Sequence, residues 1–233
     1  MKASGGTEAA KQAAGEAAAE AVEDGMVVGL GSGSTAAYAI RAIGEHVNAG
    51  LDIQGVPTSF QSRRLAKNVG IPLLALEDVT RIDLAIDGAD QVADGQLIKG
   101  GGAAHTREKI VDTTAQRFLV VVDETKLAST LSHPVPIEVL AIARMTVADR
   151  LAALGGDPTL RDGTNKDGPV VTDNGHLVID CDFGTIEEPA KLGTELSGLP
   201  GVLEHGLFVD LADTIYVGTA DGVERRESGS PDQ

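Results

Sequence analysis

The chain has 233 residues, of which 42% are hydrophobic and 23% charged, as expected for a globular protein with one large or two small domains. Its formal net charge of −16 argues against nucleic acid or an anionic membrane as a main partner. A single cysteine, Cys181, excludes an internal disulfide and a cysteine-rich zinc site, and we interpret it as a small buried residue. The excess of acidic residues also suits a surface that stays hydrated in concentrated salt, so halophilic adaptation is a hypothesis from the composition.

The N-terminal part of the chain predicts a helix, a strand, a glycine-rich loop and a second helix in succession. The first 20 residues lack a basic segment and an apolar run, and no later stretch approaches ~18 uncharged apolar residues, so we expect a cytoplasmic protein without a membrane span. Residues 7–23 are rich in Ala and Glu and predict a helix, and the apolar run 26–30 predicts a buried strand. The glycine-rich turn 31–35 follows, and the next helical stretch, 36–43, has Ser or Thr available as its N-cap.

Short apolar runs then alternate with helical stretches up to about residue 122. The predicted strands are 53–56, 71–74, 82–86 and 118–122, and the predicted helices are 60–68 and 104–115. This alternation predicts an α/β fold with a parallel sheet flanked by helices.

The texture of the sequence changes after Lys126, and we expect a domain boundary near residue 130. Pro134 and Pro136 bracket an extended segment, and a predicted helix over 145–154 ends at two glycines. The strands predicted beyond it are 170–171, 177–181 and 202–209, around a helix over 187–196, in a βαββαβ-like order that is typical of a small α+β domain. The apolar strand 214–217 is a candidate to return to the first sheet, and the polar tail 224–233 is predicted to be disordered.

The loop made by Gly31, Ser32, Gly33, Ser34 and Thr35 is the first candidate binding element. Backbone N–H groups and hydroxyls at a helix N-terminus favour an anion such as phosphate. The loop also matches the permissive dinucleotide-binding fingerprint, but no acidic residue ends the second strand. Phosphate or sugar phosphate is therefore favoured, with a dinucleotide site and a purely structural turn as the alternatives.

The run Asp87, Gly88, Ala89 and Asp90 places two carboxylates at the end of a predicted strand. The carboxyl ends of parallel strands are where open α/β sheets bind ligands. A single Asp-Gly pair is more often a turn that bonds its own backbone. The presence of two carboxylates here, together with the lysine–glycine segment that follows in the sequence, favours a functional role over a simple turn.

That segment is a lysine followed by three glycines, Lys99, Gly100, Gly101 and Gly102, and it leads into a helix that contains Glu108. A flexible linker is the alternative, but a linker is longer and richer in serine. Glu108 by itself could equally be a solvated residue that balances the helix dipole.

Metal and hydrolase chemistry find little support in the sequence. His105 lies three residues before Glu108, but no other His, Cys or carboxylate has convincing metal spacing. No histidine stands in a triad-like context with Ser or Cys.

Taken together, these segments resemble the ribose-5-phosphate isomerase A family, in order along nearly the whole chain. The resembling stretches are 29–35, 87–90, 99–102 through 106–110, 122–126, 136–139, 155–158, 172–175 and 200–202 through 206–208. The chain departs from the family at Gln91, where Glu is common, at His105, where an apolar residue is usual, and in a small polar insertion over 162–168.

The resemblance implies an enzyme that interconverts ribose 5-phosphate and ribulose 5-phosphate without a cofactor or metal. It places Glu108 on the family's catalytic base and implies substrate contacts for the following residues: Ser32, Gly33, Ser34, Thr35, Asp87, Gly88, Ala89, Asp90, Lys99, Gly100, Gly101, Gly102 and Lys126. It also implies a Rossmann-like domain over 1–131 plus 205–233, a smaller α+β, ferredoxin-like domain over 132–204, and a homodimer or a dimer of dimers.

The chemistry of an aldose–ketose isomerase assigns roles to these residues. One base can move a proton between neighbouring carbons through an enediolate, and Glu108 is our prediction for it. Lys99 would stabilise the developing oxyanion, and Asp87 or Asp90 would assist opening of the sugar ring. The phosphate would be held by the amides of 32–35 or by Lys126. The alternatives are another isomerase or deaminase of phosphorylated sugars and a non-catalytic sugar-phosphate sensor.

Overall fold

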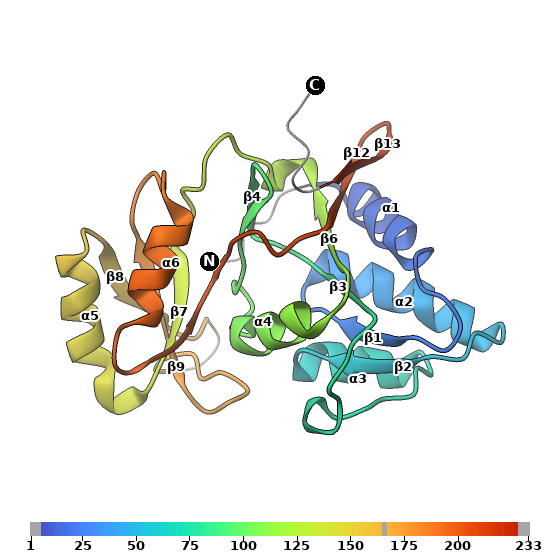
Figure 1. Ribbon diagram of the computed structural model, residues 1–233, viewed down its shortest axis with the longest axis horizontal. Coiled ribbons are helices and arrows are strands. Elements are labelled where there is room, and N and C mark those ends of the chain that lie inside the picture. The colour runs from blue at the N-terminus through green and yellow to red at the C-terminus, as the bar shows by residue number, and fades with distance from the viewer. Residues whose placement is uncertain (1–5, 165–166, 228–233) are drawn as a thin grey trace. The chain divides into compact units, whose positions relative to one another are not determined.

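The computed structural model of the protein describes residues 6–164 and 167–227, and its contacts divide the chain into two compact units (Figure 1). We call the first the parallel-sheet unit; its described residues are 6–89, 107–127 and 210–227. We call the second the antiparallel unit; it comprises residues 90–106 and the described part of 128–209. The predicted small domain, 132–204, falls inside the antiparallel unit, and where the domain boundaries lie stays a prediction.

A six-stranded sheet forms the centre of the parallel-sheet unit. Its strand order is β13-β12-β6-β3-β1-β2, and all neighbours are parallel except β12 and β13. The strands are β1 (Val27–Leu30), β2 (Gln54–Pro57), β3 (Leu84–Asp87), β6 (Phe118–Asp123), β12 (Thr214–Thr219) and β13 (Gly222–Glu227). The predicted α/β fold is confirmed, and β12 returns to pair with β6, as expected.

Helices cover both faces of this sheet because side chains alternate between the faces along each strand. Val28 and Leu30 share a core with α1 (Glu8–Ala19), α2 (Ser34–Asn48) and α3 (Phe60–Asn68). Gly29 faces the other way, where a β-carbon would lie 2.5 Å from Val111 of α4 (His105–Thr114). The missing side chain of Gly29 therefore lets α4 lie directly on β1.

Two sequence predictions for this unit were wrong. Residues 71–74 form no strand, only an isolated bridge between Gly55 and Leu73, and Pro72 has no N–H to donate to a ladder. The tail was predicted to be disordered from residue 224, but residues 224–227 belong to β13, an exposed edge strand that pairs antiparallel with β12. Residues 228–233 of that tail lie outside the described residues.

The antiparallel unit contains the βαββαβ order that the sequence predicted. Its elements are β7 (Val135–Val139), α5 (Arg144–Ala153), β8 (Asp157–Leu160), β9 (Leu177–Asp182), α6 (Pro189–Ser197) and β10 (Val202–His205). The sheet order is β10-β7-β9-β8, with all neighbours antiparallel. The second strand was predicted at 170–171 but is β8, and Val171 makes only an isolated bridge with Leu177.

A small three-stranded sheet in the same unit carries the predicted lysine–glycine segment. It consists of β4 (Gln91–Ala93), β5 (Gln96–Ile98) and β11 (Leu207–Phe208). The strand predicted over 202–209 therefore divides at Gly206 between two sheets. Gly206 donates its N–H to the Pro136 carbonyl (2.7 Å) and accepts from the Lys99 N–H (2.8 Å), and a β-carbon there would overlap the Lys99 carbonyl.

Each unit has its own apolar core, and the remaining helical elements are short. The core of the antiparallel unit includes Cys181, which is fully buried, as interpreted from the sequence. The short 3-10 helices are η1 (Leu76–Asp78), η2 (Glu124–Lys126) and η3 (Ala141–Ala143). Within 6–164 and 167–227, no helix combines the length and apolar character needed to cross a membrane.

Candidate active site

The glycine-rich loop between β1 and α2 is shaped by two glycines. A β-carbon on Gly31 would overlap the carboxylate of Asp87, so only glycine fits there. Gly33 has a φ of 103° and is the N-cap of α2, which corrects the expected Ser or Thr cap. In the described structure no side chain caps α2, so its first-turn N–H groups keep the partial positive charge that attracts an anion.

Asp87 fastens this loop to the carboxyl end of β3. Its side chain is fully buried, and its Oδ1 accepts hydrogen bonds from the N–H groups of Ser32 (2.8 Å) and Gly88 (2.7 Å). The carboxylate therefore fixes the start of the candidate phosphate loop. Asp87 and the loop, which the sequence predicted as separate motifs, form one structure in the parallel-sheet unit.

Two hydroxyl residues that the sequence analysis did not select complete this loop. The Ser32 hydroxyl lies 2.9 Å from Thr58 Oγ1 and donates to Ser59 Oγ at 2.5 Å. Thr58 and Ser59 follow β2, which lies beside β1 in the parallel sheet. The available signal was their position directly after a predicted strand, because the carboxyl ends of parallel strands share one edge of the sheet.

Glu108 lies in the first turn of α4 and is 4% exposed. It precedes Val111 by one helical turn, so the two side chains share a face. Because Val111 packs on Gly29 of β1, Glu108 extends along the same face of the helix in the direction of its N-terminus. A buried carboxylate in this position is the best candidate base in the parallel-sheet unit.

Lys126 belongs to the same unit and is half-buried in η2, directly after β6. The preceding turn is held by Asp123, which is fully buried and whose Oδ1 accepts from the Thr125 N–H at 3.0 Å. Asp87 is the last residue of β3, and Ser32, Thr58 and Lys126 follow the ends of β1, β2 and β6 within three residues. These four strands are parallel neighbours, so their C-terminal ends lie along one edge of the sheet.

The lysine–glycine segment belongs to the antiparallel unit. Lys99 is 1% exposed, and its ammonium nitrogen lies 5.1 Å from the centre of the Phe208 ring. Its backbone N–H donates to the carbonyl of Gly206 (2.8 Å), so Gly206 holds the main chain of this lysine and Phe208 of β11 lies beside its side chain. Such a buried cation is suited to stabilising a negative oxygen.

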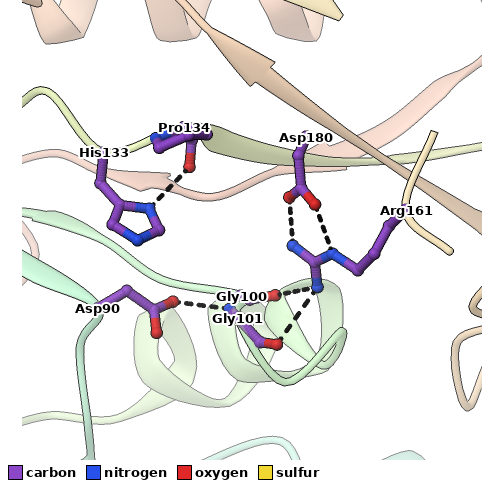
Figure 2. A network of polar contacts seen from close by, with 7 residues as sticks. All are labelled: Asp90, Gly100, Gly101, His133, Pro134, Arg161 and Asp180. Carbon is purple, nitrogen blue, oxygen red and sulfur yellow. Dashed lines mark hydrogen bonds and ion pairs between the residues drawn. The ribbon is translucent and has the colours of Figure 1, made fainter. Parts of the chain in front are cut away.

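The glycines of this segment are held by a polar network (Figure 2). Asp90 Oδ2 accepts from the Gly101 N–H at 2.6 Å, and Arg161 donates to the carbonyl oxygens of Gly100 (2.9 Å) and Gly101 (3.3 Å). Arg161 is itself paired with Asp180. No sequence pattern marks Arg161 or Asp180 as functional, because only the fold brings β8 and β9 beside the segment.

A second network fixes the beginning of α4. The fully buried Glu138 of β7 accepts hydrogen bonds from Thr106 Oγ1, from Thr172 Oγ1 (2.6 Å) and from Asn174 Nδ2 (3.2 and 3.4 Å). Thr106 stands two residues before Glu108 in the same helix. The sequence contained these residues in its family-like stretches but gave no sign that they meet.

Two of the three departures from the family pattern, Gln91 and His105, lie close to predicted site residues. Gln91 uses its Oε1 to accept from the N–H groups of Ser132 (2.7 Å) and His133 (2.8 Å), a role that a carboxylate oxygen would fill equally well. His105 is fully buried beneath Gly100, where a β-carbon would lie 2.7 Å from its Nδ1. Neither of these two residues replaces a predicted site residue.

The predicted site residues are thus distributed over both units. Those in the parallel-sheet unit are Ser32, Gly33, Ser34, Thr35, Asp87, Gly88, Ala89, Glu108 and Lys126, and those in the antiparallel unit are Asp90, Lys99, Gly100, Gly101 and Gly102. The runs 87–90 and 105–108 each pass from one unit to the other. The two Asp residues therefore have different tasks: Asp87 holds the 31–35 loop, and Asp90 holds the glycine segment.

Comparison with known proteins places the chain in one family. The family model described as "Ribose 5-phosphate isomerase A (phosphoriboisomerase A)" matches residues 54–222. Ribose-5-phosphate isomerase A of Haloarcula marismortui is 70% identical over 222 residues, which cover 95% of this chain and 97% of the relative.

Solved structures agree with this comparison. Ribose 5-phosphate isomerase A of Methanocaldococcus jannaschii superposes with a TM-score of 0.92 at 43% identity, covering 95% of this chain and 100% of that one. A D-ribose-5-phosphate isomerase in complex with phospho-erythronic acid has a TM-score of 0.93 at 46% identity, covering 96% and 100%. The chain therefore belongs to the ribose 5-phosphate isomerase A family of enzymes.

Proposed function

We propose that this enzyme interconverts D-ribose 5-phosphate and D-ribulose 5-phosphate through an enediolate, with Glu108 as the base. The reaction needs no cofactor and belongs to the non-oxidative pentose phosphate branch in the cytoplasm. The observation that carries the proposal is the buried Glu108 carboxylate on the face of α4 that packs on β1. That strand runs directly into the loop suited to a phosphate.

The proposed proton transfer uses a single carboxylate. Glu108 takes the proton from C2 of the open aldose, which leaves an enediolate. The hydroxyl proton of O2 passes to O1, and Glu108 returns its own proton to C1, which gives the ketose. A side chain that is 4% exposed is shielded from bulk water, so the proton can be returned to the substrate before it exchanges.

The other site residues bind the substrate and balance its charge. Lys99 is assigned to the oxygen that becomes negative in the enediolate, an interaction that can be worth about 3 kcal/mol for a well-placed donor. The phosphate is assigned to the uncapped N–H groups at the start of α2, with Lys126 as the alternative. Asp87 is assigned to ring opening, in addition to its contact with the loop.

The relative bound to phospho-erythronic acid supports this chemistry. Phospho-erythronic acid carries a phosphate at one end and a planar carboxylate at the other. Its two carboxylate oxygens resemble the two oxygens of an enediolate, so an enzyme that recognises that intermediate should also bind this acid.

The direct test is conversion of ribose 5-phosphate to ribulose 5-phosphate, measured with EDTA present at low and high KCl. Wild type should be active, and Glu108→Gln should lose several orders of magnitude in kcat while it remains folded, because the amide keeps the shape but cannot accept the proton. Glu45→Gln, on the exposed surface of α2, is the matched control. An inert, folded wild type would favour a sugar-phosphate sensor or another sugar-phosphate activity, and an active Glu108→Gln would reject the mechanism.

We further propose that the chain assembles as a homodimer or a dimer of dimers. The proposal is supported only by the family to which the chain belongs. Light scattering after size-exclusion chromatography in high KCl measures the mass directly, and a monomer of 23.9 kDa would contradict the assignment.

A further inference from the structure

Arg161 has no role in the proposed reaction so far as described, but its side chain contacts the glycine segment 100–102. It follows β8 directly, and its side chain is 12% exposed. Figure 2 shows its guanidinium group between the carboxylate of Asp180 and the carbonyl oxygens of two glycines. Nε donates to Asp180 Oδ2 at 2.7 Å, and Nη2 pairs with Asp180 Oδ1. Nη1 donates to Gly100 and Gly101 at 2.9 and 3.3 Å.

This arrangement distinguishes Arg161 from a phosphate ligand. All three guanidinium nitrogens already donate hydrogen bonds inside the antiparallel unit. The Asp180 carboxylate forms a bidentate pair with the guanidinium and balances its charge. Arg161 therefore acts on the protein backbone and leaves the binding of anions to other groups.

The backbone that it contacts is rich in glycine, and one internal bond, from the Ala103 N–H to the Gly100 carbonyl (2.9 Å), closes its turn. Three consecutive glycines lose more conformational freedom on ordering than other residues do. Gly100 has a φ of 106°, and Ala103, which ends the segment, has a φ of 59°. Asp90 binds the Gly101 N–H from the other direction, so the loop is fixed by an acceptor on its amide and a donor on its carbonyls.

Fixing the carbonyl of Gly101 also fixes the next amide. In a trans peptide the C=O and N–H bonds point in opposite directions, so the Gly102 N–H is directed away from Arg161. Gly102 is exposed, and a β-carbon on it would meet no atom within 4 Å. The space beside the Gly102 Cα is therefore open to a ligand.

We propose that Arg161, oriented by Asp180, is a positioning residue for the isomerase reaction. It holds the carbonyl groups of Gly100 and Gly101. As a result the Gly102 N–H points toward the substrate, and the neighbouring Lys99 keeps its position in the site. The inference rests on the proposed function in one respect, namely that residues 99–102 contact the sugar phosphate.

The experiment compares Arg161→Ala with Arg161→Lys and with Arg150→Ala, an exposed arginine of α5 that serves as the control. Loss of the guanidinium should lower kcat/KM by roughly 10- to 100-fold, because a small misplacement of a substrate-contacting loop has effects of that size. Lysine should not restore the rate, since a single ammonium cannot bridge a carboxylate and two carbonyls. Added guanidinium or methylguanidinium ions should restore part of the activity of Arg161→Ala, and NaCl at equal ionic strength should not.

Hydrogen–deuterium exchange separates loop positioning from the overall reaction. The amides of residues 100–103 should exchange faster in Arg161→Ala than in wild type or Arg150→Ala. If wild type has no isomerase activity, the proposed function fails, but faster exchange would still support the loop contact. If Arg161→Ala does not fold, Arg161→Ala/Asp180→Ala removes both charges and is expected to show the same kinetic and exchange changes.

Three results would overturn the proposal. A folded Arg161→Ala or double variant could keep kcat/KM within about twofold of wild type. The exchange of residues 100–103 could be unchanged. The lost activity of Arg161→Ala could respond to NaCl as much as to guanidinium ions.

Discussion

Replacing Glu138 by alanine should destabilise the protein by about 3–5 kcal/mol, because the change leaves several buried donors without their acceptor. Glu138 is fully buried and receives hydrogen bonds from Thr106, Thr172 and Asn174. Each buried polar group that loses its partner costs about 1–3 kcal/mol, and partial relaxation of the two hydroxyls keeps the total below the sum.

Glu138→Gln provides the matched variant, with an expected loss of about 1–2 kcal/mol. Its amide oxygen can replace Oε1, which accepts from Thr172 and Asn174, and its NH₂ group can donate to a reoriented Thr106 hydroxyl. The order of stability should be wild type, then Gln, then Ala.

The assay is urea unfolding followed by circular dichroism at one fixed KCl concentration, with kcat measured on the folded fraction. Thr106→Val should lower kcat by a larger factor than it alters KM. The substitution removes the hydrogen bond to Glu138 that holds the first turn of α4, the helix that contains Glu108. A loss below about 1 kcal/mol for Glu138→Ala would refute the assignment of these bonds as a stabilising network.

Two further predictions concern pH and salt. Burial, with the nearby Asp157 and Asp182 carboxylates, raises the pKa of the Cys181 thiol from 9.0 to about 12. The unfolded chain therefore loses this proton first, so stability should fall as pH rises above about 9, by at most about 1.4 kcal/mol per pH unit, and Cys181→Ala should lack this component in pH-dependent unfolding. The formal charge of −16 predicts that the thermal unfolding midpoint rises with KCl concentration, and a midpoint that is independent of KCl would contradict halophilic adaptation.

Most of the fold could be predicted from local sequence patterns. The run 26–30, the glycine-rich turn and the helix that follows it become β1, the loop and α2, because burial periodicity and glycine placement act over a few residues. The errors have equally local causes. Pro72 cannot complete a ladder, and β13 is an exposed edge strand whose polar residues resemble a disordered tail.

The sequence by itself determined the chemical types at the site and their order along the chain. Motifs of carboxylates, cations and glycines selected Lys99, Asp87 and the 31–35 loop, because such residue types indicate chemistry without tertiary information. Glu108 was selected only by the resemblance to the family, since its spacing alone fits a solvated helix residue equally well. The roles of these residues remain predictions until the variants are measured.

Only the tertiary structure decided which groups support them. Arg161 lies 61 residues after Gly100 in the sequence, and Asp180 lies 79 residues after Gly101. Glu138 lies 32 residues after Thr106. No local pattern encodes such pairs, since each depends on the register of β7, β8 and β9. Sheet pairing joins residues that are far apart in the sequence. This pairing brings the Arg161 guanidinium to the backbone carbonyls of the glycines and the Glu138 carboxylate to the threonine hydroxyls.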